Sequence, residues 1–99
     1  MKDQKSENHN QYVEKDKWNA PFLLAASFQN LIQFTGSFTR NGILYWQFSP
    51  KSRALSLVEQ FRTKTNPSIP ARDLFEAINV FWSQIAKAKE MKYGESILE

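Results

Sequence analysis

The chain has 99 residues, a net charge of +3 at pH 7 and no cysteine. This length is sufficient for one domain with a modest core, and the lack of cysteine excludes disulfides and cysteine-ligated metals. Because no run of about 18 apolar residues occurs and the N-terminal segment is polar, neither a membrane span nor a secretory signal is expected. We therefore expect a cytoplasmic protein with no membrane partner.

Residues 1–17 are polar and charged and show no apolar periodicity. They are predicted to form a disordered leader, followed by a single domain over residues 18–94 and a frayed end at residues 95–99. A first helix is predicted with Asn19 as its N-cap and Pro21 in its first turn. Its inward residues follow helical spacing: Leu24, Phe28, Leu31 and Ile32.

The strongest strand signal is a β-hairpin over Phe34–Pro50, with Asn41 and Gly42 between two alternating apolar runs. Two registers compete for it. A two-residue turn would pair Arg40 with Ile43, which mixes apolar and polar side chains on both faces. A three-residue loop with a bulge at Gly42 instead collects one apolar face: Phe34, Phe38, Leu44, Trp46 and Phe48. Because a one-residue slip moves every side chain to the other face, the apolar pattern predicts the three-residue loop.

Two more helices are predicted after the hairpin. The second begins directly, with Ser49 as N-cap and Pro50 at its first position. Its inward residues are Ala54, Leu57, Val58 and Phe61. The third opens at Pro70 and is expected to stop near Gly94. Its apolar stripe is the clearest in the chain: Ala71, Leu74, Phe75, Ile78, Phe81, Trp82 and Ile85.

The element order is therefore α-β-β-α-α in an α+β domain, in which three helices cover one face of a single β-hairpin. A lone hairpin has two unpaired edges and is marginally stable by itself. Edge pairing between two copies would extend it to a four-stranded sheet in a dimer.

The sequence offers little for catalysis. His9 is the only histidine and lies in the leader, so neither a catalytic triad nor a histidine metal cluster can be assembled. Asp73 and Glu76 share one side of the third helix, but Arg72 and Glu76 at i, i+4 make an ordinary surface ion pair the simpler account. The glycines form no phosphate-binding loop. We expect a non-enzymatic protein with no cofactor and no metal.

Positive charge is concentrated in the middle of the chain, where residues 40–72 hold six basic residues against Glu59 alone. A solvated basic surface is one reading. Basic residues at a hairpin tip and in the first turns of a helix also bind phosphates, and an exposed aromatic ring stacks on a base. We therefore predict single- or double-stranded nucleic acid as the partner. The predicted contact residues are Arg40, Tyr45, Lys51, Arg53, Arg62 and Lys64.

The competing hypothesis is a protein-interaction module that forms a homodimer. The chain carries more apolar surface than one hairpin covers. This surface belongs to Trp18, Phe22, Trp82 and the C-terminal half of the third helix. The surplus would form a dimer interface. The two hypotheses are compatible, since a dimer would align two basic patches.

Three short segments carry a resemblance to a known family: Phe22–Phe28, Leu44–Phe48 with the helix after it, and Ile69–Phe75. On these segments, over about residues 20–90, the chain resembles a family of small uncharacterised prokaryotic and phage domains of unknown function. The resemblance implies the element order and a single domain. It implies no activity and no site residue.

Overall fold

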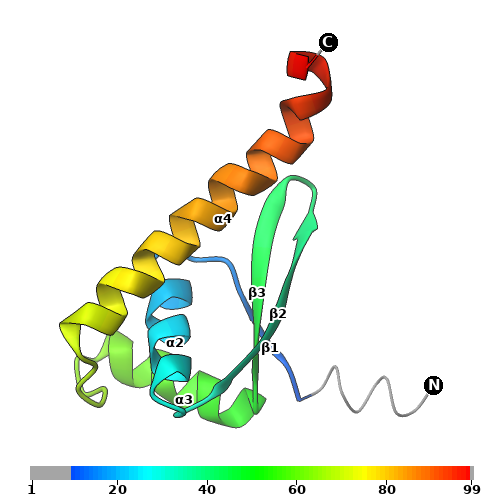
Figure 1. Ribbon diagram of the computed structural model, residues 1–99. Helices are drawn as coiled ribbons and strands as arrows, with labels where there is room; N and C mark the ends of the chain where they lie inside the picture. The colour runs from blue at the N-terminus through cyan, green and yellow to red at the C-terminus, as the bar shows by residue number, and fades with distance from the viewer. Residues whose placement is uncertain (1–9, 99) are drawn as a thin grey trace.

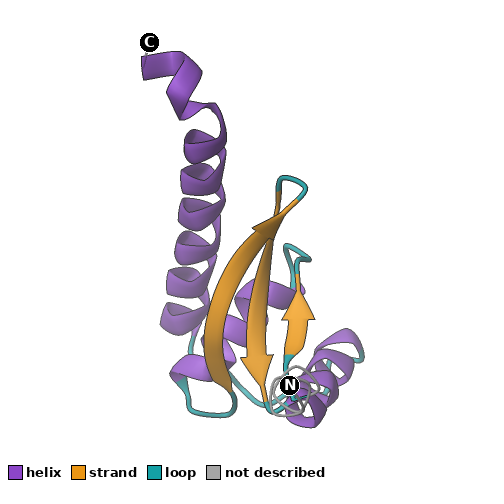
Figure 2. Ribbon diagram, turned by 90° about the vertical axis from the view of Figure 1, so that its right-hand side faces the viewer, coloured by secondary structure: helices purple, strands orange, loops and turns teal. Residues whose placement is uncertain are grey.

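The computed structural model describes residues 10–98, and their side chains over residues 10–89. Over this range the elements are β1 (Tyr12–Glu14), α2 (Asn19–Phe28), β2 (Gln33–Arg40), β3 (Ile43–Ser49), α3 (Lys51–Arg62) and α4 (Ala71–Leu98). The strands form one antiparallel sheet in the order β1-β3-β2 (Figure 2). The predicted α+β class and α-β-β-α-α order are confirmed, with one short strand added at the N-terminal end.

The added strand, β1, lies in the segment that was predicted to be a disordered leader. Tyr12 pairs with Phe48 and Glu14 with Trp46, so β1 covers the free edge of β3. Glu14 is buried, and its carboxylate accepts the Tyr12 hydroxyl at 2.6 Å and the backbone N–H groups of Lys15 and Asp16. The leader prediction is therefore wrong for this segment, while residues 1–9 lie outside the described part of the chain.

The partly buried contact between Tyr12 and Glu14 makes the free energy of unfolding depend on pH in the alkaline range. Burial raises the pKa of the Tyr12 phenol, and its hydrogen bond to Glu14 raises that pKa further. Above pH ~10 the unfolded chain releases this proton while the folded chain keeps it. The stability that this contact contributes is therefore fully present below pH ~10 and declines as the pH rises above that value. Urea denaturation between pH 8 and pH 11 should show this decline, and Tyr12→Phe should flatten it. Equal slopes in the two proteins would contradict the assignment.

Helix α2 begins differently from the prediction. Asn19 is its first residue rather than its N-cap, and Asp16 Oδ2 accepts the backbone N–H groups of Trp18 and Asn19, each at 2.8 Å. Asp16 therefore satisfies donors that a helix leaves unpaired at its start. Pro21 lies in the first turn as predicted. The helix is buried over nearly its whole length, from Ala20 to Ala26.

The hairpin adopts the two-residue turn, so the predicted three-residue loop is wrong. Arg40 pairs with Ile43, and Asn41 and Gly42 have φ values of 53° and 79°. Positive φ at both central residues is the requirement of a type I′ turn, whose twist matches that of the strands. Phe38 consequently pairs with Tyr45 and leaves the face on which the sequence pattern had placed it.

A bulge explains how this register still buries an apolar face. The pairing shifts between Phe34 and Gly36, which leaves Thr35 as the extra residue. Phe34 therefore lies opposite Phe48, as predicted, although every pair nearer the tip is displaced by one residue. The inner face carries Phe34, Trp46 and Phe48, and the ring centroid of Phe34 lies 5.7 Å from that of each of the other two in tilted pairs. One inserted residue thus accommodates both the favoured turn and the core.

Gly36 is the residue that makes the bulge possible. Its φ of +149° is one that L side chains rarely adopt, whereas an added Cβ would meet only Gln47 Oε1, at 3.7 Å. Strain rather than crowding should therefore lower the free energy of unfolding of Gly36→Ala, by about 1–3 kcal/mol. Urea denaturation measures this, with Ser37→Ala as the neighbouring control on the same strand. A Gly36→Ala variant as stable as Ser37→Ala would show that the bulge does not need glycine.

The ends of the last two helices also differ from the predictions. Ser49 is not an N-cap but the buried last residue of β3, and Pro50 occupies the cap position with an extended backbone. Helix α4 continues through Gly94 to Leu98, so Gly94 is not its stop. Residues 95–98, which were predicted to be frayed, continue α4, and residue 99 lies outside the described part of the chain.

The core lies between the sheet and the two helices α2 and α4, which share one face of it (Figure 1). Phe81 of α4 stacks on Trp46 of β3 with ring centroids 5.6 Å apart, and Phe22 of α2 stacks on Phe61 of α3 at 4.3 Å. Helix α3 lies at the end of the sheet where β3 leaves it (Figure 1). Within the described residues, no helix combines the length and the hydropathy needed to cross a membrane.

Candidate nucleic-acid interface

The outer face of the hairpin carries a stacked aromatic pair next to its tip. Phe38 of β2 and Tyr45 of β3 are opposite in the register, with ring centroids 5.2 Å apart and ring planes 17° apart. Arg40 lies two residues after Phe38 on the same face, and its Cζ is 5.4 Å from the centre of the Phe38 ring. We call Phe38, Tyr45 and Arg40 the aromatic platform. Its two rings are half-buried and its guanidinium is exposed.

The platform exists because of the observed register. Side chains of paired residues project to the same side of a sheet, and the helices cover the opposite side, where Trp46 and Phe48 are buried. Ile43 and Val13, both partly exposed, and the uncharged Gln47 continue the outer face along the strands. The result is a weakly polar surface with one cation at its tip end.

The six predicted contact residues fall into two separate groups. Arg40 and Tyr45 belong to the platform, whereas Lys51, Arg53, Arg62 and Lys64 lie on α3 or directly after it. Strand β3 has seven residues and joins the tip to α3, so about 20 Å separates the two ends at ~3.3 Å per residue. Figure 1 shows the tip beside the second half of α4 and α3 at the other end of the sheet. The structure therefore does not bring these residues together as one patch.

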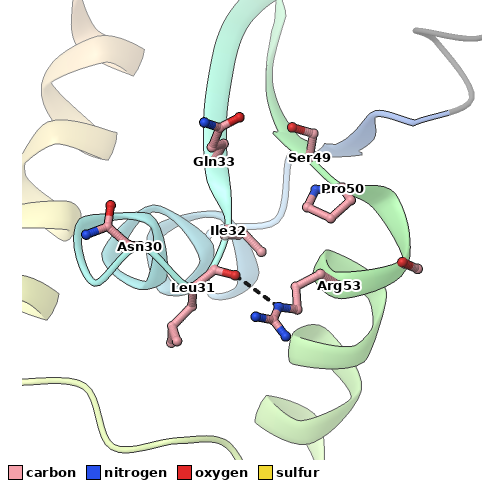
Figure 3. Close-up of a pocket in the computed structure, with 8 residues that line it drawn as sticks. Asn30, Leu31, Ile32, Gln33, Ser49, Pro50 and Arg53 are labelled. Atoms are coloured by element: carbon pink, nitrogen blue, oxygen red, sulfur yellow. Dashed lines mark hydrogen bonds between the residues drawn. The ribbon is translucent and has the colours of Figure 1, made fainter.

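At the start of α3, a shallow hollow of about 550 Å³ adjoins Ser52 and Arg53 (Figure 3). Arg53 is partly committed to the fold, because its Nε donates to the carbonyl oxygen of Leu31 at 3.1 Å. Lys51 and Ser52 are exposed in the first turn of the helix. This end of the molecule thus has basic side chains but no aromatic ring in the hollow's lining.

The remaining two predicted residues differ in their availability. Arg62 pairs with the carboxylate of Glu59 one turn earlier, and this hydrogen bond lowers the pKa of Glu59. Part of the Arg62 charge is therefore already balanced within the helix. Lys64 lies in the turn that ends α3, with a φ of 63°, and is exposed.

A larger cleft lies between the hairpin tip and the second half of α4, with a volume of about 800 Å³. Lysines from two distant parts of the chain line it: Lys15 from the segment after β1, and Lys87 and Lys89 from α4. We call this space the tip cleft. No local sequence pattern predicted this cleft, because Lys15 lies more than 70 residues before Lys87 and Lys89.

Carboxylates in the described part of the chain show no arrangement suited to metal binding. No group of three or more histidine, aspartate or glutamate residues there is placed to hold a metal ion. Asp73, which had been considered with Glu76, accepts a hydrogen bond from the Nε2 amide of Gln29 and so ties α4 to the end of α2. Its role in the fold is thereby explained without a ligand.

A scan against protein-family models found no match to this chain, and searches of curated proteins and of solved structures found none either. The resemblance to small prokaryotic and phage domains therefore stays a prediction. Function has to be argued from the site itself.

Proposed function

We propose that this protein is a non-enzymatic nucleic-acid-binding protein that contacts single strands through the aromatic platform. The observation that carries the proposal is the stacked pair Phe38–Tyr45 with Arg40 beside it, on the sheet face opposite to the one that α2 and α4 cover. Aromatic side chains on an exposed sheet stack on unpaired bases, and a guanidinium next to them contacts either a base plane or a phosphate. Bases in a duplex are already stacked, so the platform favours single strands.

The distribution of charge supports the same proposal. The chain carries a net charge of +3, and the excess lies in the folded middle rather than in the leader. A cationic surface raises the rate of encounter with a polyanion and the affinity for it at low salt. The group on α3, Lys51, Arg53 and Lys64, is too far from the platform to share one nucleotide with it. In this proposal it adds to the net positive charge and makes no direct contact with the strand.

Fluorescence anisotropy with labelled single- and double-stranded DNA and RNA tests the proposal between about 50 and 200 mM salt. We expect single strands to bind more tightly than duplexes, and the affinity to fall steeply as salt increases. Flat titrations with every oligonucleotide at the lowest salt concentration would overturn the proposal. Equal affinity for single strands and duplexes would remove the platform as its basis.

A second observation favours the alternative role, assembly of two copies of this chain. Phe75, Ile78 and Trp82 lie three and four residues apart on one side of α4, and Phe75 is 66% exposed. The predicted inward stripe of this helix is wrong at these three positions, because the core side is formed by Ala77 and Phe81. Aromatic residues left uncovered on one helix face are typical of a protein interface. Since β1 covers one edge of β3, the unpaired edges of the described sheet are the outer sides of β1 and β2.

Sedimentation velocity over a range of protein concentrations tests this alternative. A homodimer that uses the α4 face should dissociate in a Phe75→Glu variant, because a carboxylate buried in an apolar interface is strongly unfavourable. A wild-type protein that sediments as a monomer at every concentration would exclude this role. The nucleic-acid proposal does not depend on that outcome.

A further inference from the structure

The tip cleft lies against the inner face of the hairpin tip, and the aromatic platform lies on the outer face of the same two strands. Phe38 and Ile43 belong to the outer face, like Tyr45 and Arg40. They also line the cleft from the hairpin side. The opposite wall is α4 from Gln84 to Lys89. A chain molecule bound on the platform therefore has to pass over the edge strand β2 or over the tip to enter this space.

The lining of the cleft has the chemistry of a polyanion site. Lys15, Lys87 and Lys89 supply three ammonium groups, and each is exposed rather than sequestered by the core. Hydroxyls of Ser37 and Thr39 face the same space from the inner side of β2. Among the described residues, no acidic side chain lines the cleft. Phosphate oxygens are the groups that such ammonium and hydroxyl donors recognise together.

The shape of the cleft selects a chain over a single phosphate ion. A volume of about 800 Å³ is far larger than one phosphate needs and is in the range of sites for extended ligands. Leu44 and Ile85 form an apolar floor beneath the lysines. A ligand that fills this space therefore presents repeated negative charge toward the lysines and less polar groups, such as sugars, toward the floor.

We propose that the tip cleft holds the phosphodiester backbone of the single strand whose bases stack on the aromatic platform. This inference rests on the proposed function and assigns Lys15, Lys87 and Lys89 as phosphate contacts. The platform and the cleft bind different parts of the strand. The platform binds bases through stacking, which is insensitive to salt, and the cleft binds backbone through charge, which releases counterions.

The test compares two triple variants. Each removes three positive charges, one from the tip cleft and the other from the opposite end of the molecule. The cleft variant is Lys15→Gln/Lys87→Gln/Lys89→Gln, and the matched control is Lys51→Gln/Arg53→Gln/Lys64→Gln on and after α3. Affinity for a fluorescent oligothymidylate of about eight nucleotides is measured by anisotropy against salt concentration. Circular dichroism confirms that both variants fold. In single strands each neutralised phosphate contributes about 0.7 to the slope of log K against log salt.

We expect the cleft variant to bind about 10-fold or more weakly near 100 mM salt, with a slope shallower by about 2, and the control to keep the wild-type slope. A cleft variant with the wild-type slope, or two variants that lose the same slope, would overturn the inference while leaving the proposed function in place. No binding by the wild-type protein would overturn the proposed function and this inference together. Equal competition by inorganic phosphate at the same phosphate concentration would reduce the cleft to a site for free anions.

Discussion

Phe81→Ala should lower the free energy of unfolding by about 3–5 kcal/mol, the usual cost of removing a buried phenylalanine ring. Phe81 is 2% exposed and stacks on Trp46, so it joins α4 to the centre of the sheet. Its removal leaves a cavity between α4 and the sheet. Urea denaturation followed by far-ultraviolet circular dichroism measures the change. Phe81→Leu, which removes less volume, gives a second value if the alanine variant is too unstable to fold.

Trp82 provides a matched control for this expectation. It is the next residue on the same helix, has an even larger ring and touches Phe81 edge-on at 5.1 Å, yet it is 50% exposed. Trp82→Ala should therefore cost less than Phe81→Ala, because only about half of the Trp82 side chain is buried in the folded protein. Equal losses for the two variants would contradict the placement of the core side of α4.

Phe38→Ala should weaken the binding of a short single strand by roughly 5- to 150-fold, as should Tyr45→Ala, since stacking contributes about 1–3 kcal/mol per base. The slope of affinity against salt should stay unchanged in both variants, because neither substitution removes a charge. Tyr45→Phe keeps the ring and should retain most of the affinity. Anisotropy titrations at several salt concentrations separate the two effects.

Trp18 supplies the control for nonspecific aromatic contacts. It is 67% exposed at the start of α2, carries the largest aromatic ring and lies outside the platform. Trp18→Ala should leave the affinity for the single strand unchanged. If Trp18→Ala weakened binding as much as Phe38→Ala, exposed aromatic residues in general, rather than the stacked pair, would account for the interaction.

The hairpin shows how far local sequence rules reach. Asn41-Gly42 correctly marked the turn, and its two positive φ values are those that favour these residue types. The apolar pattern then selected the wrong register, because the possibility of an inserted residue at Thr35 was not considered. Gly36 was the available signal, since an isolated glycine inside a strand often marks a bulge.

Helix α4 shows a limit of periodicity. Its apolar residues cover more than one face, so the spacing alone predicts a helix but not which side meets the sheet. The decisive residue is Ala77, fully buried and small enough for close packing, which contributes little to a search for large apolar side chains. Phe75, Ile78 and Trp82 were therefore assigned to the core although they are exposed.

The candidate site was predicted in part. Arg40 and Tyr45 were identified from the hairpin itself, because a turn and an alternating strand fix which residues reach the tip and the outer face. Phe38 was missed together with the register. Lys15 and Lys87 line one cleft only because α4 packs beside the hairpin. No local sequence pattern encodes this tertiary arrangement.

The most direct test of this account is a titration of isotopically labelled protein with a single strand of about eight nucleotides, followed by amide chemical shifts. Binding at the hairpin tip predicts the largest changes in residues 36–45 of the hairpin and 84–89 of α4, at both sides of the tip cleft. It predicts small changes in α3. Changes confined to residues 51–64, or no changes at millimolar oligonucleotide, would contradict the assignment of the tip as the nucleic-acid interface.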